Sequence, residues 1–323
     1  MITRRTFFFA AAMGFCFGTV TLAGAQSYPT KVIKLVLPYT PGSPNDVLAR
    51  LVAAPLSARL GQGVVVENRP GGGGSIGTRA VATADPDGYT LLFAASISHV
   101  ISALYSGVPY DPIKDFAPIA PVAINSWVLV VPPALPANSV AEFIAYAQAN
   151  PNKLNFGFGQ GTAPQLVGEW LKATTGIKLT SIPYKGGAQA ITDMMGGRID
   201  LNIGTTATLV PLIRDGKIKA LAVMSETRNA VLAEVPTMAE SGFPQLTGSN
   251  WGGILAPAGT PDAIVARLNT EVNAILRAPE MKASIARIGF ESQALTAAEY
   301  AAFLTRETEK WLPIAKQSGI KMD

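Results

Sequence analysis

The sequence predicts an α/β protein of two domains, each with a sheet that helices cover on both faces. Three observations favour this prediction. Short apolar runs alternate with amphipathic stretches along most of the chain, which is the pattern of strand followed by helix. The apolar runs contain few charged residues, as expected for strands buried on both sides. A mature chain of about 300 residues suits two medium-sized domains better than one.

The first set of elements follows the N-terminal leader. Apolar runs predict strands at 32–37 (VIKLVL), 63–68 (GVVVEN) and 89–96 (YTLLFAAS), and amphipathic stretches predict helices near 46–60 and 75–83. Strand and helix alternate throughout, so we assign these elements to one α/β domain.

A second set of elements begins with WVLVV. Its predicted strands are 127–131, 154–158, 178–184, 199–203 and 218–223. Its predicted helices are 139–149, 163–174 and 188–195. After it, two stretches with apolar spacings of three and four predict C-terminal helices within 261–289 and 297–317.

Two proline-rich segments separate these sets. Residues 115–126 (DFAPIAPVAINS) and 235–261 (VPTMAE to AGTP) read as irregular crossings between domains. We therefore expect a first lobe made of 26–124 and 250–323, and a second, inserted lobe made of 125–249.

Residues 1–25 read as an export signal. They combine Arg4 and Arg5, an apolar middle and the small residues Ala23-Gly24-Ala25. The two arginines fit both the twin-arginine route and the general secretory route, and both routes lead to the periplasm. Cleavage after Ala25 would also remove Cys16, the only cysteine in the sequence, so no internal disulfide is expected.

Charge and hydropathy limit the partners of the mature protein. The formal charge of +4 includes Arg4 and Arg5, so the mature chain carries +2, which is too little to indicate nucleic-acid binding. No later stretch reaches about 18 uninterrupted apolar residues, so we expect a soluble mature protein.

The sequence offers little catalytic or metal-binding chemistry. With His99 as the one histidine, the usual zinc sets are excluded, and the carboxylates lack calcium-loop spacing. The pattern G-x-S-x-G around Ser75 would suit a serine hydrolase with His99 as base, but the four glycines 71–74 support a nucleophile poorly. The candidate acids, Asp85 and Asp87, lie in a predicted turn. We expect no catalytic residue, metal or cofactor, and we interpret His99 as a structural residue or a pocket donor.

Two similar Pro-Tyr loops each follow a predicted strand and lead into a predicted helix. They are LPYTPG at 37–42 and IPYKGG at 182–187. Open α/β sheets bind ligands beyond the carboxyl ends of their strands, so both loops suit one cleft. In the first loop, Ser43 to Asp46 reads as a capping box, and the backbone at Gly42 beside a helix N-terminus could bind an anion. The alternative is a helix start with no further role.

A glycine-rich turn at 157–162 (GFGQGT) precedes the next predicted helix. It lacks the last glycine of a dinucleotide fingerprint and has no assignable acidic partner for a ribose, so a small-anion site is favoured. Thr162 has the alternative role of a simple N-cap. Among the tryptophans, Trp251 is the best candidate for a cleft wall because small residues surround it in GSNWGG.

Taken together, these motifs resemble the extracytoplasmic solute-binding receptors of tripartite tricarboxylate transporters, also called Bug proteins. The resemblance runs in order over essentially the whole mature chain. It rests on the segments PYTPGSPND, VVVENRPGGGGSIG, SISHVISALY, PYDPIKDFAPI, GQGTAPQL, IPYKGGAQAITDMMGGRIDL and ALAVMSETRNAVLAEVPTMAESGFP. It implies a type II periplasmic-binding-protein fold whose two lobes close over a small organic acid. It also implies a periplasmic monomer that delivers this ligand to a permease with a large and a small integral-membrane subunit.

The resemblance also implies where the ligand binds. In the family, the loop that corresponds to Tyr39–Asp46 surrounds a ligand carboxylate, partly through ordered water, and the segment that corresponds to Gly159–Gln165 holds the ligand from the other lobe. The expected ligand-binding residues are Tyr39, Thr40, Gly42, Ser43, Asn45, Asp46, Ser96, Ser98, Gly159, Gly161, Thr162, Gln165, Tyr184, Gly204 and Thr205. Asp46 would repel an anion in direct contact, so we expect a water-bridged or capping role for it.

The chain departs from the commoner family pattern in two places. The segment 43–45 (Ser-Pro-Asn) stands where the loop usually reads P-G-G before its aspartate, and Gly204 stands where many members carry an aspartate. The second departure leaves the ligand open among aliphatic dicarboxylates, tricarboxylates, aromatic acids and amino acids. Two alternatives to a transport receptor also stay open: a periplasmic sensor that presents its ligand to a signalling protein, and a secreted hydrolase that uses Ser75 and His99.

Overall fold

The computed structural model describes residues 28–96, 99–100, 108, 110–160 and 162–318. Its strands are β1 (Ile33–Leu37), β2 (Val64–Asn68), β3 (Thr90–Ala95), β4 (Phe116–Val131), β5 (Asn155–Gly159), β6 (Thr180–Tyr184), β7 (Leu201–Thr205), β8 (Lys219–Val223), β9 (Ser249–Pro257) and β10 (Glu291–Ser292). Its helices are α1 (Pro44–Leu60), η1 (Gly72–Gly74), α2 (Ser75–Ala82), α4 (Val140–Ala149), α5 (Ala163–Thr175), α6 (Gly187–Met195), α7 (Thr206–Arg214), η3 (Ala230–Leu232), α8 (Asp262–Arg277), α9 (Pro279–Arg287) and α10 (Ala297–Ser318).

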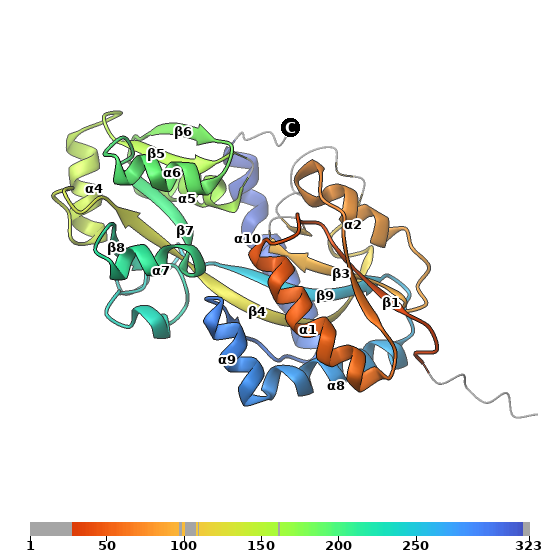
Figure 1. Ribbon diagram of the computed structural model, residues 1–323. Coiled ribbons are helices and arrows are strands. Elements are labelled where there is room, and N and C mark those ends of the chain that lie inside the picture. Colours follow the sequence, from red (N-terminus) through yellow and green to blue (C-terminus); the bar gives the residue numbers. More distant parts are fainter. Residues whose placement is uncertain (1–27, 97–98, 101–107, 109, 161, 319–323) are drawn as a thin grey trace, which may run out of the picture.

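The strands form two parts that share β4. The order along the sheet is β2-β1-β3-β9-β4-β7-β5-β6, and β8 and β10 also pair with β4. In Figure 1, β1, β3 and β9 lie on one side with α1, α2, α8 and α9, and β5 to β8 lie on the other with α4 to α7. The predicted α/β class is confirmed, since most strands alternate with helices and the helices cover the sheet.

β4 carries the chain from one part to the other. Ser126 is the last residue of β4 that pairs with β9, opposite Ser249, and Trp127 is the first that pairs with β7, opposite Thr205. We call the part that contains β1 the first lobe and the part that contains β7 the second lobe. The predicted boundaries at 124/125 and 249/250 fall at this crossing, and the division into two domains stays a prediction.

The proline-rich segments 115–126 and 235–261 are less irregular than we expected. The first lies almost wholly within β4, and the second contains β9. Pro118 and Pro121 stand where the pairing of β4 with β9 shifts register, which is where a strand tolerates a residue without an N–H group. The prediction of irregular crossings was therefore wrong for the strand portions of both segments.

Local signals set the bounds of α1. Ser43 is its N-cap, with an extended backbone (φ −66°, ψ 157°), and Pro44 occupies the first helical position, as predicted. The helix ends at Gly61, whose φ of 68° lies in the left-handed region that glycine adopts most readily.

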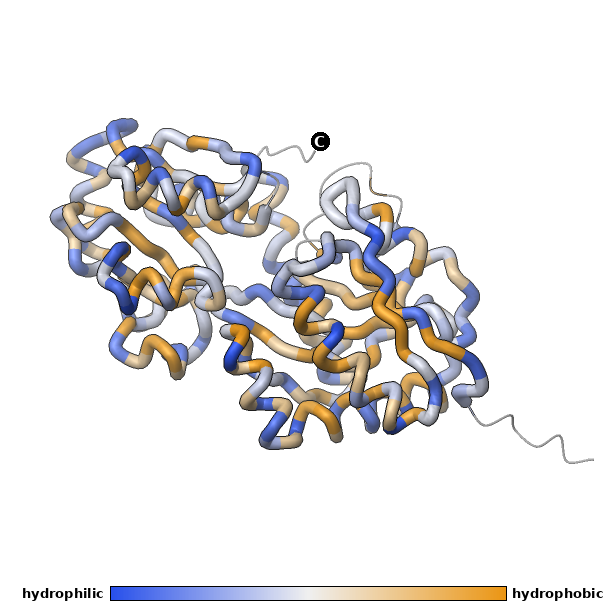
Figure 2. The backbone as a smooth tube through the Cα atoms, in the orientation of Figure 1, coloured by the Kyte–Doolittle hydropathy of each residue, from blue (hydrophilic) through white to orange (hydrophobic). Residues whose placement is uncertain are grey.

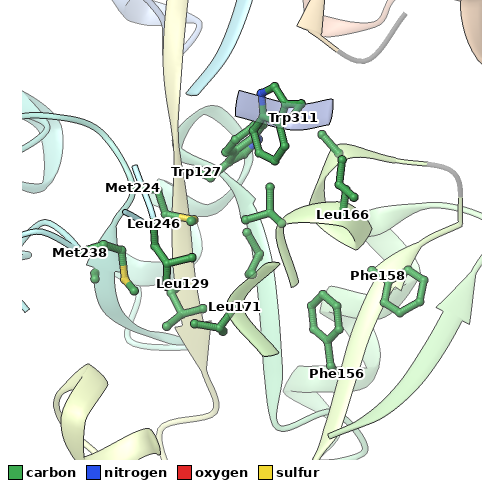
Figure 3. Packing of buried hydrophobic residues seen from close by; sticks show 14 of the residues in the cluster. Trp127, Leu129, Phe156, Phe158, Leu166, Leu171, Met224, Met238, Leu246 and Trp311 are labelled. Carbon is green, nitrogen blue, oxygen red and sulfur yellow. The ribbon is translucent and has the colours of Figure 1, made fainter. Parts of the chain in front are cut away.

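The core extends from one lobe into the other. Figure 2 shows hydrophobic residues concentrated along the strands and on the helix faces that cover them. In the second lobe, Leu129, Phe156, Leu166 and Leu171 pack in one buried cluster that reaches Trp127 (Figure 3). This cluster continues into the first lobe, because buried residues such as Trp251 belong to it as well.

The last helix also contacts both lobes. Near its end, the ring of Trp311 lies edge-on to Trp127 of β4 and Trp170 of α5, with centroid separations of 5.5 and 5.3 Å. We assigned the C-terminal helices to the first lobe, and that division stays a prediction. The second half of α10 packs on the second lobe, because its tryptophan completes the core there.

Candidate functional site

Strand directions bring the carboxyl ends of the two sheets toward each other. In the first lobe, β9 is antiparallel to both β3 and β4, so β3 and its parallel neighbour β1 run in the direction of β4, toward the second lobe. In the second lobe, β7 is antiparallel to β4, and β5 is parallel to both β6 and β7. The loops that follow β1 and β3 therefore face the loops that follow β5, β6 and β7 across the β4 crossing.

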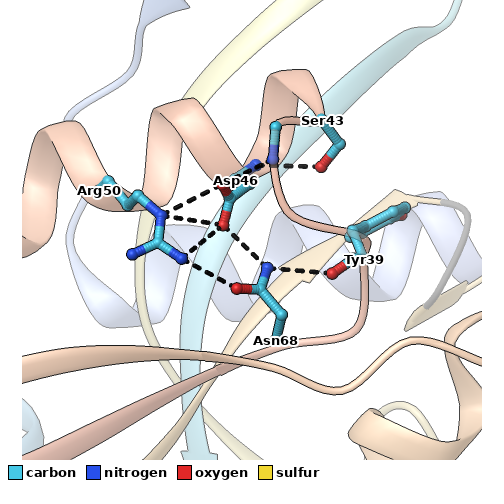
Figure 4. Close-up of polar contacts among 6 residues, drawn as sticks. Tyr39, Ser43, Asp46, Arg50 and Asn68 are labelled. Carbon is cyan, nitrogen blue, oxygen red and sulfur yellow. Dashed lines mark hydrogen bonds and ion pairs between the residues drawn. The ribbon is translucent and has the colours of Figure 1, made fainter.

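Asp46 fixes the loop between β1 and α1 (Figure 4). Its carboxylate accepts hydrogen bonds from the Gly42 amide at 2.9 Å, Asn68 Nδ2 at 2.8 Å and Arg50 Nε at 3.1 Å. Burial would raise the pKa of this carboxyl, but the hydrogen bonds from Arg50, Gly42 and Asn68 together lower the pKa below its ordinary value. Asp46 is only 4% exposed, and its negative charge is compensated by Arg50 of α1.

The other residues of this loop have distinct environments. Ser43 Oγ accepts a hydrogen bond from the Asp46 amide at 3.3 Å, which confirms its N-cap role. Asp46 reaches back to Gly42 and not to the N-cap residue itself. Gly42 has a φ of 80°, a conformation that favours glycine, and both Gly42 and Thr40 are exposed. Tyr39 is half-buried, and its carbonyl accepts a hydrogen bond from Asn68 Nδ2 at 3.0 Å.

The loop after β5 has a similar form in the second lobe. Thr162 is the N-cap residue of α5, but its Oγ1 donates to the Gly159 carbonyl at 2.6 Å and does not cap the helix. A Cβ on Gly159 would lie 3.2 Å from the Gly187 amide nitrogen, so glycine allows β5 to approach α6. Gln165 is half-buried in the first turn of α5. Gly161 lies outside the described residues.

Tyr184, at the end of β6, forms contacts within its own lobe. Its hydroxyl donates a hydrogen bond to Asp193 Oδ2 at 2.8 Å, and Asp193 also pairs with Arg198 at 2.8 Å. Burial and the Asp193 carboxylate raise the pKa of the tyrosine. The Tyr184 carbonyl accepts from the Gln160 amide at 2.9 Å, which ties this loop to the loop after β5.

Gly204 and Thr205 form the end of β7. A Cβ on Gly204 would lie 2.7 Å from Leu209 Cδ1 of α7, so glycine at this position permits close helix packing. Thr205 is the half-buried N-cap residue of α7, and its Oγ1 lies 3.3 Å from Thr208 Oγ1. The structure thus gives Gly204 a packing role, and its effect on ligand choice stays a prediction.

The segment after β3 contains Ser96 and His99. Ser96 is wholly buried, and Ser98 lies outside the described residues. His99 is also wholly buried, with Nε2 2.8 Å from the Pro112 carbonyl, so the ring donates a proton to that oxygen. Burial lowers the pKa of His99 to about 4. These contacts agree with the interpretation of His99 as a structural residue.

The structure adds two asparagines that we did not predict as site residues. Asn125 of β4 and Asn250 of β9 pair directly opposite each other just before the crossing, and they are 2% and 8% exposed. Ser96 Oγ donates to Asn250 Oδ1 at 2.9 Å. Asn125 Oδ1 has no hydrogen-bond donor among the described residues. The signal in the sequence was a polar residue inside each apolar run, at INSWVLVV and GSNWGG.

Asn45 of α1 lies near this group of polar residues. Leu48 Cδ2 of α1 lies 3.4 Å from the position of a Cβ on Gly252 of β9, and α1 and β9 run in the same direction. One helical turn back from Leu48 is Asn45, and two strand residues back from Gly252 is Asn250. Asn45 Oδ1 is buried and, within the described part of the chain, lacks a donor. We therefore assign Asn45, Ser96, Asn125 and Asn250 to one group of polar residues at the base of the facing loops, and we call this group the polar floor.

Trp251 does not line a cleft, contrary to our expectation. It is wholly buried and packs edge-on against Tyr300 and Phe303 of α10, with centroid separations of 6.2 and 5.7 Å. Strand alternation explains the difference, because Trp251 points to the opposite face of β9 from Asn250.

Within the ranges that the structure describes, no three His, Cys, Asp or Glu side chains come together as a metal site. Among the helices described, none is both long and apolar enough to span a bilayer.

Several known proteins resemble this chain in sequence and in fold. A model of the tripartite tricarboxylate transporter family receptor matches residues 48–320. Protein BugT of Bordetella pertussis is 34% identical over 318 residues, which cover 97% of this chain and 98% of BugT.

Two solved structures from Rhodopseudomonas palustris carry small dicarboxylates. One, with adipate, is 36% identical to this chain and has a TM-score of 0.78. The match covers 91% of this chain and 99% of the adipate-bound protein. The other, MatC with bound malate, is 28% identical to this chain and has a TM-score of 0.75. The match covers 89% of this chain and all of the MatC chain. The expected fold of a periplasmic binding protein is confirmed by these similarities.

Proposed function

The chain belongs to the tripartite tricarboxylate transporter receptor family, and on this premise we propose that it binds a small organic carboxylate between its lobes for delivery to a permease. One observation carries the proposal: the loops at the carboxyl ends of both sheets face each other across the β4 crossing. Ligands of open α/β sheets bind at this edge. The family relationship supports a solute receptor, and the facing loops indicate where the solute binds.

The proposed binding residues come from both lobes. From the first lobe, Thr40 offers an exposed hydroxyl group beside the N-terminus of α1, where the helix dipole favours an anion. The Gly42 amide already donates to Asp46, so Gly42 contributes by letting the ligand approach a loop without a side chain there. From the second lobe, the N-terminus of α5 presents Thr162 and Gln165. Asp46 acts indirectly, because its carboxylate is already occupied by donors from its own lobe.

The ligand class is suggested by relatives and by the polar floor. Relatives 36% and 28% identical to this chain were solved with adipate and with malate. Both compounds have two carboxylates, and the amide side chains of Asn45, Asn125 and Asn250 can donate hydrogen bonds to the second one. A small aliphatic dicarboxylate is therefore the proposed ligand.

The proposal includes a cellular setting. The protein is proposed to work as a periplasmic monomer after cleavage of residues 1–25, without nucleic acid, and to dock on a permease with a large and a small membrane subunit. Its leader has the features of an export signal, and its relatives include periplasmic binding proteins.

A binding role without catalysis is also proposed. The His99 ring is buried and donates to the Pro112 carbonyl, and in the described residues no hydrogen bond joins it to Ser75. A base for a serine nucleophile must lie within hydrogen-bond reach of it. The geometry therefore argues against a hydrolase built on these two residues.

A thermal-shift screen of the mature protein tests the proposed function. The probes are adipate, malate, citrate, benzoate and glutamate. A dicarboxylate at one hundred times its dissociation constant should stabilise the protein by about 2.7 kcal/mol. Absence of stabilisation by every carboxylate would contradict the proposal.

A further inference from the structure

A hollow lies on the other face of the crossing strands from Asn125 and Asn250. Its volume is about 390 Å³, and its base includes Ile124 and Ser126 of β4 and Ser249 of β9. Side chains alternate between the faces of a strand, so Asn125 and Asn250 point away from it. This hollow is therefore distinct from the polar floor described above, and its volume suits a small molecule.

Both lobes line this hollow. The second lobe contributes 225–227 and 247–248, and the first lobe contributes residues around β10 together with one face of α10. Any molecule bound there would contact both lobes at the hinge.

Two cations of α10 line the hollow, and they differ in their partners. Lys310 pairs with Glu307 and lies 5.3 Å from the centre of the Trp311 ring. Arg306 is exposed, and it forms no ion pair with a carboxylate in the part of the chain that the structure describes. The Arg306 guanidinium is therefore available to a carboxylate in the hollow.

Several acceptors also line the hollow, namely the carboxylates of Glu226, Glu291 and Glu307 and the side chain of Gln293. Glu307 is paired with Lys310. The Glu291 carboxylate accepts a hydrogen bond from Asn229 Nδ2 at 3.0 Å, but no Lys or Arg of the described chain pairs with it. Gln293 Oε1 is buried and has no donor among the described residues. A buried acceptor without a donor is unfavourable, so Gln293 Oε1 suits a ligand that carries an N–H group. The exposed Glu291 carboxylate, which has no cationic partner in the described chain, favours a ligand that carries a positive charge.

Apolar groups complete the lining. Ile124, Leu295 and Phe303 offer hydrophobic surface to the same hollow. From these contacts we propose that the hollow between α10 and the crossing strands binds a small zwitterion, an α-amino acid with an aliphatic side chain. Its carboxylate pairs with Arg306, its ammonium group donates to Glu291 and Gln293 Oε1, and its side chain lies on Ile124 and Phe303.

Binding at the hinge has a consequence for the other site. A ligand that contacts both lobes favours the lobe arrangement in which its contacts are complete. If that arrangement differs from the one that the carboxylate site prefers, each ligand weakens the other by the same factor. The amino acid would then regulate uptake of the carboxylate.

Isothermal titration of the mature protein with three matched probes tests the proposal. L-Leucine carries both charged groups, 4-methylpentanoate lacks the ammonium group, and 3-methylbutylamine lacks the carboxylate. We expect L-leucine to bind and each analogue to bind at least tenfold more weakly, a difference of about 1.4 kcal/mol. L-Valine serves as a second amino acid of the same class.

Variants locate the binding. Arg306→Gln should weaken L-leucine at least tenfold, and Gln293→Leu should weaken it several-fold. Arg277→Gln, which removes an exposed arginine at the end of α8, should leave it unchanged. The proposal is overturned if neither amino acid binds, if the analogues bind equally well, or if Arg306→Gln binds L-leucine like the parent protein. A carboxylate from the thermal-shift screen should still stabilise Arg306→Gln, so failure here is separable from failure of the proposed function.

Discussion

The ring of Trp311, near the end of the chain, packs edge-on against Trp127 at the point where β4 enters the second lobe, with their planes at 80°. Both side chains are almost completely buried. A Cβ on Gly248 would lie 3.0 Å from one ring and 3.4 Å from the other, so both tryptophans pack against the chain that returns to β9. The last helix thus begins in the first lobe and completes the core of the second.

Trp311→Ala should therefore destabilise the protein more than any change on the outer face of α10. Truncation of a buried tryptophan costs about 3–5 kcal/mol in unfolding free energy. The neighbouring Leu312→Ala is the control, because Leu312 is 36% exposed and its loss should cost about 0.5 kcal/mol. Urea denaturation of both variants measures the difference, and equal midpoints would show that the tryptophan contact is not structural.

His99 should make stability depend on pH. Its pKa is about 4 in the folded protein and 6.5 ordinarily, because burial disfavours the charged ring. Between these values the unfolded state binds more protons, so stability is full above pH 6.5 and falls as pH decreases toward 4. The loss is at most about 1.4 kcal/mol per pH unit.

His99→Gln removes this titration and keeps an N–H donor for the Pro112 carbonyl. The unfolding free energy of the parent should fall relative to that of the variant between pH 6.5 and 4. Ligand binding should stay measurable, because His99 is structural. Parallel pH profiles, or a folded variant that does not bind, would contradict this assignment.

Much of the fold could be predicted from the sequence because its signals are local. Ser43, Pro44 and Gly61 fix the ends of α1 through their own backbone preferences. The strand content of 115–126 could not be read from its prolines, because the bulges that accommodate Pro118 and Pro121 depend on pairing with β9. Asn125 and Asn250 become a site only through that pairing, and Trp251 is buried by a helix that begins almost fifty residues later.

Asn125→Leu should separate binding from stability. The Oδ1 atom of Asn125 is buried without a donor among the described residues, so an apolar side chain of similar size should cost little stability. The ligand would lose an amide donor, and affinity should fall about tenfold or more. Asn273→Leu is the control: Asn273 is also buried, but it bonds to the Leu295 carbonyl within the first lobe. Titration of both variants should show weaker binding for Asn125→Leu alone, and unchanged affinity would remove Asn125 from the site.

Substitutions at Gly204 test the charge of the ligand. Both Gly204→Ala and Gly204→Asp must displace Leu209, but only aspartate adds a negative charge. Two unit charges about 5 Å apart repel by roughly 3 kcal/mol at an effective dielectric near 20. With screening by water and salt, Gly204→Asp should bind the native ligand about ten- to a hundredfold more weakly than Gly204→Ala. Equal affinities would leave position 204 with its packing role only.

The central claim is that the facing loops of the two lobes bind one small carboxylate. A crystal structure of the mature protein with the best carboxylate from the thermal-shift screen tests it most directly. The account predicts one carboxylate group beside the loop Tyr39–Asp46 and the N-terminus of α5, with the rest of the ligand over Asn125 and Asn250. A ligand bound only outside these loops, or only in the hollow beside α10, would contradict it.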